Sequence, residues 1–259
     1  MKTLVIPDVH QKVEWVCSIL EREKYDEVVF LGDWVDTLES PPAVFNFRET
    51  CAFLRDLSTS HSEKDKFVFL IGNHDLQYMH LNCKPSTSSV VAERAYYCSG
   101  FTKNKAREWR KVFYDEGLRD DFFWRTFRVS HLSQGYVFSH AGISEKHLSY
   151  GETVESFVNK SCQEAWYNYR QLTHPKNYIL TDVGECRGGD SSIGGVLWLD
   201  WRHEFQPSPQ IGRQILGHTT LPEPQIMGVH PDCESWNLDT GKHYAMISDG
   251  KVEIRRCSS

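Results

Sequence analysis

Short apolar runs alternate with amphipathic stretches along the first third of the chain. The runs at 2–6, 28–31 and 66–71 are dominated by apolar residues, which is typical of strands buried on both faces of a parallel sheet. The stretches 13–24 and 44–57 between them are predicted helices, and the first has its apolar residues at helical spacing. This alternation of strand and helix predicts parallel βαβ units in an α/β fold.

The remainder of the chain contains further predicted strands and one long helix. Apolar runs at 136–138, 196–199 and 214–216 predict three more strands. Residues 152–172 carry an apolar stripe at helical spacing, which predicts a long amphipathic helix. The segment 244–255 has two apolar runs on either side of an Asp-Gly turn and therefore predicts a β-hairpin.

The segment at about 77–134 interrupts the alternation and is rich in charged and aromatic residues. Within it, 92–97 and 103–114 look helical, and 122–124 is an aromatic cluster. We expect a helical and aromatic insertion, packed over one edge of the sheet of a single domain spanning 1–259. Its aromatic side chains could stack on a nucleobase, but a local hydrophobic core is the favoured role.

Composition narrows the range of functions. The net charge of −6 and the pI of about 6.1 argue against broad electrostatic binding of nucleic acid or of an anionic membrane. No apolar run is long enough for a signal peptide or a membrane span, so we expect a cytoplasmic protein. The eight cysteines contain no CxxC pair and are expected to be reduced thiols rather than zinc ligands.

Five of the predicted strands end in aspartate, asparagine or histidine, mostly beside glycine: Asp8 and His10, Asp33 and Asp36, Asn73 and His74, His140, and His218. In α/β sheets, ligands gather at the carboxyl ends of strands, so these residues are expected to share one site. Buried carboxylates are tolerated when they are paired or bound to metal. A mixed nitrogen and oxygen set without thiolate suits manganese, iron or zinc.

The order of these motifs, D-x-H, G-D-x-x-D, G-N-H-D, H-A-G and G-H-T, resembles that of the calcineurin-like metallophosphoesterases over nearly the whole chain. Within that superfamily the chain resembles the phosphoprotein-phosphatase branch, especially small bacterial and phage phosphatases and the diadenosine tetraphosphatase type. The resemblance implies a β-sandwich of two mixed sheets flanked by helices. Phosphodiesterase members usually end in G-H-x-H, and Thr220 in the place of the second histidine argues against that branch.

The resemblance also implies a role for each strand-end residue. Two divalent metal ions, manganese being our choice, would be held by Asp8, His10 and Asp33 and, across the bridging Asp33, by Asn73, His140 and His218. Metal-bound hydroxide would attack phosphorus in line. His74 would act as general acid, with its tautomer and pKa set by a hydrogen bond to Asp36. The alternative for His74 is a surface histidine after a turn.

The chain departs from the family pattern at its phosphate clamps. Thr37 and Ile71 stand where protein phosphatases commonly have arginines. Arg202 resembles the third family arginine and is the candidate phosphate ligand beside Asn73, although it could be a surface arginine at a strand end. Arg187, in the glycine-rich loop 181–195, and Arg94, in the insertion, are the other candidates. Pro7 replaces a glycine before Asp8 and leaves the ligands intact.

Three functions fit these residues. The first is a metal-dependent phosphatase that hydrolyses phosphomonoesters of small molecules or phosphoproteins. The second keeps the metals but cleaves a phosphoanhydride, as a nucleotide pyrophosphohydrolase of the diadenosine tetraphosphatase type. The third is a non-catalytic scaffold that binds metal, which the complete ligand set disfavours. The expected partner is a phosphorylated small molecule, nucleotide or phosphopeptide, with no stable nucleic-acid or membrane binding.

Overall fold

The computed structural model describes residues 1–37, 46–60, 65–80, 98–115, 122–161, 179–228 and 230–257. Its first sheet contains β1 (Lys2–Ile6), β2 (Glu27–Phe30), β3 (Phe67–Leu70), β4 (Phe127–Arg128), β10 (His243–Ser248) and β11 (Lys251–Arg256), in the order β11-β10-β1-β2-β3-β4. Strands β1 to β4 are parallel, whereas β10 and β11 form an antiparallel hairpin added to β1. This sheet contains the three predicted N-terminal strands and the predicted C-terminal hairpin.

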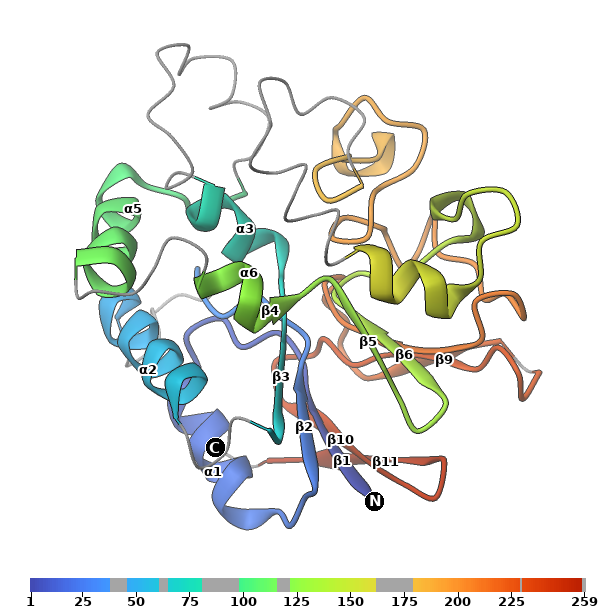
Figure 1. Cartoon of the computed structure of the whole chain (residues 1–259), viewed down its shortest axis with the longest axis horizontal. Coiled ribbons are helices and arrows are strands. Elements are labelled where there is room, and N and C mark those ends of the chain that lie inside the picture. The colour runs from blue at the N-terminus through green and yellow to red at the C-terminus, as the bar shows by residue number, and fades with distance from the viewer. Residues whose placement is uncertain are drawn as a thin grey trace.

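The second sheet contains β5 (Ser130–Ser133), β6 (Tyr136–Ser139), β7 (Arg213–Leu216), β8 (Gln225–Met227) and β9 (Ser235–Asn237), in the order β5-β6-β7-β9-β8. Its three central strands, β6, β7 and β9, are parallel, and β5 and β8 are antiparallel edges. Both sheets are therefore mixed, and the predicted two-sheet α/β architecture is confirmed (Figure 1).

The two faces of the first sheet bury different partners because side chains alternate along each strand. Val5, Val29 and Leu31 pack against Phe138 and Ile215 of the second sheet, forming the core between the sheets. The residues that alternate with them along β1 and β2 pack against helices in a larger cluster. Sheet packing on sheet, with helices outside, places the carboxyl ends of strands from both sheets at one edge.

The helices with given bounds in the described residues are α1 (Val13–Arg22), α2 (Phe47–Thr59), α3 (Asn73–His80), α5 (Lys103–Arg110) and α6 (Phe122–Thr126), with a π-helical turn at Lys111–Asp115 and 3₁₀ turns at Glu145–His147 and Glu185–Arg187. A capping box between Asn46 and Glu49 fixes the start of α2 and contributes about 1 kcal/mol. Figure 1 shows α1, α2 and α5 together on one side of the first sheet.

The predicted insertion at 77–134 is tied to both sheets. Helix α3 continues to His80, and β4 and β5 supply an edge strand to each sheet. Trp109 stacks on Tyr78 and Phe123, with ring centroids 5.7 and 5.1 Å apart, and all three side chains are buried. These aromatic residues have the predicted hydrophobic role, but they belong to the large cluster that also packs against the first sheet and do not form a separate local core. Residues 92–97 lie outside the described part of the chain.

One predicted strand is wrong, and one predicted helix is described only in part. Residues 196–199 form a turn, in which the Trp198 amide donates to the Gly195 carbonyl at 2.8 Å. The run is apolar because Val196 and Leu197 are fully buried in the larger hydrophobic cluster, not because it joins a sheet. Of the helix expected at 152–172, residues 154–161 are helical and 162–172 lie outside the described part.

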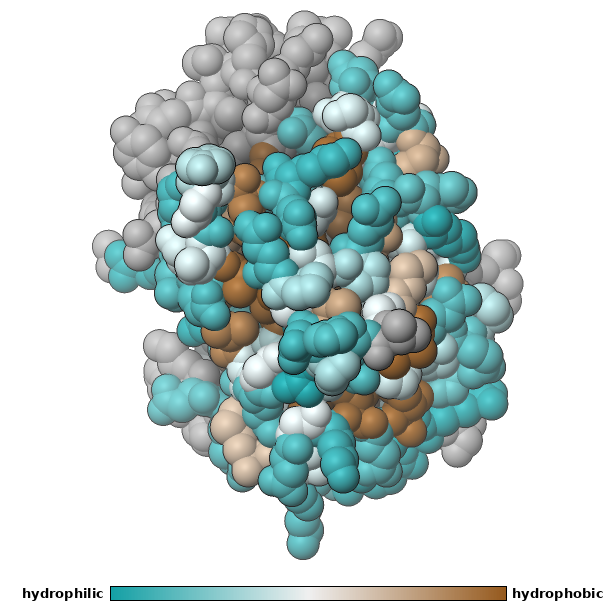
Figure 2. All heavy atoms as spheres, turned by 90° about the vertical axis from the view of Figure 1, so that its right-hand side faces the viewer, coloured by the Kyte–Doolittle hydropathy of each residue, from teal (hydrophilic) through white to brown (hydrophobic). Residues whose placement is uncertain are grey.

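The surface is mainly polar where the second sheet and its loops face outward. Figure 2 shows hydrophilic side chains over most of this face, with hydrophobic ones in separate groups. Within the described ranges, the protein has no helix that is both long and apolar enough to cross a membrane.

Candidate metal centre

The predicted site residues meet at the edge where strands from both sheets end. Asp8 follows β1, Asp33 follows β2, and Asn73 opens α3 directly after β3. From the second sheet, His140 follows β6 and His218 follows β7. Except for the partly exposed His10 and His218, the predicted metal ligands are buried, with Asp8 and Asp33 each 2% exposed and His140 fully enclosed.

The backbone is bent unusually at several of these positions. His10, Asp33, Asp36 and His218 have positive φ values of 44°, 49°, 65° and 67°. This left-handed conformation is uncommon for residues with a side chain and persists only where the surroundings enforce it. The turns aim polar side chains inward, and the concentration of such turns at one edge is typical of a functional site.

Asp8, His10 and Asp33 form a first group whose ligand atoms all lie within 4.8 Å of one another. His10 Nδ1 donates to the Asp36 carbonyl at 2.7 Å, which leaves Nε2 unprotonated in the neutral ring. That nitrogen lies 3.8 Å from Asp33 Oδ2. Asp8 Oδ1 accepts the His218 backbone N–H at 2.9 Å, so Asp8 also joins the first sheet to the second.

Asp33, His140 and His218 form a second group within the same 4.8 Å limit, and Asn73 lies among them. Asn73 Oδ1 is 2.9 Å from His140 Nε2 and 3.0 Å from His218 Nδ1. Asp33 Oδ2 is 3.5 Å from His140 Nε2. The same Asp33 oxygen therefore faces the imidazoles of both groups.

His140 carries the clearest sign that a cation belongs in this group. Its Nδ1 donates to the Leu31 carbonyl at 2.9 Å. Burial lowers the pKa of His140 despite the charge of Asp33, so the ring is neutral and Nε2 has no proton. A lone pair on Nε2 thus faces a lone pair on Asn73 Oδ1 at 2.9 Å. A cation between these atoms would turn that repulsion into coordination.

Two orphaned atoms also fit bound metal. Among the described residues, Asp8 Oδ2 and His218 Nε2 are buried without a hydrogen-bond partner. Burial, with the charges of Asp239 and Asp33, raises the pKa of Asp8 well above its usual range. Burial also lowers the pKa of His218 well below its usual range. Such groups are costly without a partner, and coordination by divalent cations satisfies them.

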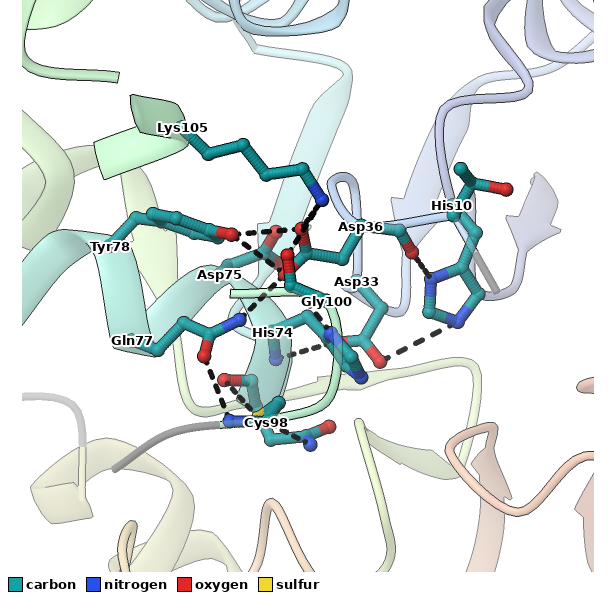
Figure 3. Close-up of polar contacts among 12 residues, drawn as sticks. His10, Asp33, Asp36, His74, Asp75, Gln77, Tyr78, Cys98, Gly100 and Lys105 are labelled. Atoms are coloured by element: carbon teal, nitrogen blue, oxygen red, sulfur yellow. Dashed lines mark hydrogen bonds and ion pairs between the residues drawn. The ribbon is translucent and has the colours of Figure 1, made fainter. Parts of the chain in front are cut away.

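His74 and Asp36 form a separate pair beside the ligands (Figure 3). His74 Nδ1 lies 3.3 Å from Asp36 Oδ2, and the His74 backbone N–H donates to Asp33 Oδ1 at 2.9 Å. Burial lowers the pKa of His74, but the charges of Asp33 and Asp36 outweigh it and leave that pKa raised. With 6% of its surface exposed, His74 is not the surface histidine of the alternative reading.

Sequence reasoning missed the residues that hold Asp36. Its carboxylate accepts from Gln77 Nε2 at 2.6 Å, from the Tyr78 hydroxyl at 2.8 Å and from Lys105 Nζ at 2.7 Å (Figure 3). Lys105 comes from α5 in the inserted segment, far from Asp36 in sequence. The placement of Gln77 and Tyr78 one turn after His74 on α3 was the only available signal.

Asp75, the last residue of the G-N-H-D motif, joins two of the ligand loops. Its two oxygens accept the backbone N–H groups of Trp34, at 2.9 Å, and Gly72, at 3.1 Å. Burial, with the charge of Asp33, raises the pKa of Asp75 to about 8. Gly72 lies so close to this junction that an added Cβ would be 2.0 Å from Asp33 Oδ1. The G-N-H-D motif therefore fixes the geometry of two ligand loops and also supplies candidate site residues.

The candidate arginines lie around the loop that follows His218. Arg202 is exposed, and its Nη2 donates to the Thr220 carbonyl at 2.7 Å. Arg187 Nη2 contacts Asp200 Oδ2 at 2.8 Å and the Thr219 hydroxyl at 2.6 Å. Its Nε is buried without a hydrogen-bond partner in the described part of the chain. Arg94 lies outside the described residues.

A third group of ligand-type side chains, Cys186, Asp200 and His203, lies near Arg187. The Asp200 carboxylate is already engaged, with one oxygen paired to Arg187 and the other accepting from His203 Nδ1 at 2.8 Å. These side chains therefore stabilise the loop through an ion pair and a hydrogen bond. The six cysteines whose thiols are described form no disulfide with one another.

Two mixed sheets in a sandwich, with carboxylates, imidazoles and one amide gathered at their common edge, define a metallophosphoesterase fold. The family model for calcineurin-like phosphoesterases matches residues 1–234, and the chain belongs to that family. The chain is thus a metal-dependent phosphoester hydrolase by family, and the resemblance seen in its motifs is confirmed.

Solved structures agree on the fold. The chain is similar to a cold-active protein-tyrosine phosphatase of a psychrophilic Shewanella species, with a TM-score of 0.53, 14% identity, and coverage of 98% of this chain and 80% of the other. It is also similar to a protein serine/threonine phosphatase of Saccharomyces cerevisiae, with a TM-score of 0.53, 12% identity, and coverage of 100% and 81%. No curated protein matches the sequence.

Proposed function

We propose that this protein is a dinuclear metal-dependent phosphatase that hydrolyses phosphomonoesters of small molecules or of flexible phosphorylated peptides. The proposal assigns Asp8, His10 and Asp33 to one cation, and Asp33, Asn73, His140 and His218 to the other. Manganese is the proposed metal, because the donors are nitrogen and oxygen without thiolate. When bound, such a pair of cations neutralises phosphoryl oxygens and lowers the pKa of bound water.

The observation that carries the proposal is the position of Asp33. One oxygen of its carboxylate faces His10 Nε2 at 3.8 Å and His140 Nε2 at 3.5 Å, from the two ligand groups. A single carboxylate shared by two otherwise complete nitrogen and oxygen sets is the arrangement that a dinuclear centre requires. The other Asp33 oxygen is held by the His74 backbone N–H, which fixes the orientation of the carboxylate.

The remaining residues supply proton transfer and phosphate binding in this proposal. His74, held by Asp36, donates a proton to the leaving-group oxygen. Asn73 contacts the phosphate through the second N–H of its amide while its oxygen faces the metal, and Arg202 provides a cation for the phosphoryl oxygens. The likeness to two protein phosphatases, at 14% and 12% identity, concerns the fold, and the monoester substrate is part of this proposal.

The test compares metal content and activity in the same preparations. We expect protein that has been stripped with chelator and reloaded with Mn²⁺ to bind two ions per chain and to hydrolyse p-nitrophenyl phosphate faster than bis(p-nitrophenyl) phosphate. Asp33→Asn should lose bound metal, because the bridge loses a charge shared by both cations. Asp249→Asn, a matched change in the β10–β11 turn, should retain metal and activity. Preference for the diester, or full metal occupancy in Asp33→Asn, would overturn the proposal.

A further inference from the structure

A cysteine from the inserted segment contacts Asn73 at its side-chain nitrogen and at its backbone carbonyl. Asn73 Nδ2 donates to Cys98 Sγ at 3.1 Å, and the Cys98 thiol donates back to the Asn73 carbonyl oxygen at 3.3 Å. Cys98 is 8% exposed and Asn73 is 4% exposed, so both bonds are shielded from water. The thiol therefore fixes both the side chain and the backbone of Asn73.

Gln77 links this cysteine to the pair that contains His74. The Cys98 backbone N–H donates to Gln77 Oε1 at 2.8 Å, and Gln77 Nε2 donates to Asp36 Oδ2 at 2.6 Å. Gln77 is 1% exposed and uses both ends of its amide in these bonds. A continuous path of hydrogen bonds thus runs from Asp36 through Gln77 and Cys98 to Asn73. Figure 3 shows the part of this path from Asp36 to Cys98.

The orientation of the Asn73 amide decides whether it can bind a cation. The oxygen and nitrogen of an asparagine amide occupy nearly equivalent positions, but only the oxygen has a lone pair for a metal. With Nδ2 bonded to Cys98, Oδ1 must face His140 and His218, at 2.9 and 3.0 Å. Without an acceptor at Cys98, the two orientations of the amide become closer in energy.

Cys98 differs in its surroundings from Cys51, another buried cysteine. Cys51, in α2, lies in the hydrophobic cluster between the helices and the first sheet. Cys98 is in none of the three hydrophobic clusters of the described residues, and its contacts are polar. Packing alone does not explain a thiol at this position.

We propose that Cys98 is a positioning residue that holds the Asn73 amide with its oxygen directed to the cation, and that Gln77 braces Cys98 against Asp36. The inference rests on the proposed role of Asn73 as a metal ligand. It assigns to the inserted segment a part in building the centre, because Cys98 reaches the site from outside the strand-end motifs. Mutation of a residue that hydrogen-bonds to a metal ligand typically lowers metal affinity or activity by about 10–100-fold.

The test measures Mn²⁺ affinity by titration calorimetry on metal-free protein. Cys98→Ala removes the acceptor and the donor, and we expect it to weaken one of the two Mn²⁺ sites by about tenfold or more. Cys98→Ser retains a donor and an acceptor and should recover most of that loss. Cys51→Ala, the matched control, should leave Mn²⁺ affinity unchanged while lowering the melting temperature.

The Asn73→Asp variant separates an effect on the orientation of the Asn73 amide from a general loss of structure. In Asn73→Asp both terminal atoms are oxygens, so the orientation imposed by Cys98 no longer matters. Adding Cys98→Ala to that background should therefore cost much less Mn²⁺ affinity than it does alone, which a double-mutant cycle measures. If Cys98→Ala does not fold, Gln77→Ala should weaken Mn²⁺ binding in the same direction, and unchanged binding in Gln77→Ala would then contradict the inference.

The outcomes distinguish this inference from the proposed function. Wild-type protein that binds no Mn²⁺ would contradict both the dinuclear centre and this inference. Wild-type protein that binds two ions, together with a folded Cys98→Ala of equal affinity, would overturn the role of Cys98 alone. Equal losses in Cys98→Ser and Cys98→Ala would also overturn it, because the hydroxyl retains the hydrogen bonds.

Discussion

Replacing His74 with asparagine should slow turnover while the metal ligands stay in place. The contact that links residue 74 to Asp33 is its backbone N–H, at 2.9 Å, which any side chain retains. The imidazole itself contacts Asp36 at 3.3 Å and belongs to neither ligand group. Loss of a general acid typically costs about 10²–10⁴ in rate. We therefore expect His74→Asn to lose turnover of that order with unchanged bound metal.

The choice of substrate makes this prediction more specific. A general acid matters most when the departing oxygen is basic, so the loss should be larger for phenyl phosphate, whose leaving group has a pKa of about 10, than for p-nitrophenyl phosphate, whose leaving group is more acidic. Steady-state rates on both substrates, with metal measured in each preparation, give the comparison. His230→Asn, at an exposed histidine, is the control. Equal losses on the two substrates, or lost metal, would refute the assignment.

Three further results are expected. Arg202→Ala should raise the inhibition constant for inorganic phosphate about tenfold, since a charge-assisted contact is lost, and unaltered inhibition would place the clamp elsewhere. Burial raises the pKa of Glu27, but hydrogen bonds led by His131 outweigh it and leave that pKa lowered. The stability that Glu27 contributes should therefore be present above its ordinary pKa of 4.5 and be lost as the pH falls below that value. Glu27→Gln should flatten this part of a profile of melting temperature against pH. Gly217→Ala should reduce Mn²⁺ affinity, because a Cβ there would lie 1.9 Å from Asp8 Oδ2, and wild-type affinity would show that Asp8 can move without loss.

The sequence predicted the ligand loops because their signal is local. A short apolar run that ends in glycine and aspartate, as before Asp33, specifies a buried strand and a turn. Parallel strands end at one edge, so the motifs after β1, β2 and β3 could be brought together without coordinates. The same reasoning reached His140 and His218, because β6 and β7 are also parallel.

Other features depend on contacts between distant segments. Lys105 reaches Asp36 from α5, and Cys98 reaches Asn73 from the same inserted segment, with no periodic pattern to indicate either contact. The run at 196–199 was predicted wrongly because an apolar run does not by itself distinguish a buried strand from a buried turn. Sequence periodicity also does not predict the position of loop side chains such as that of Arg202, because their direction depends on tertiary packing.

The location of bound metal tests the central claim most directly. Crystals of the protein loaded with Mn²⁺, measured for anomalous scattering, should show two ions about 3.5–4 Å apart, both in contact with the Asp33 carboxylate. One ion should also contact Asp8 and His10, and the other Asn73 and His140. A single ion at full occupancy, or two ions of which only one touches Asp33, would contradict the dinuclear centre.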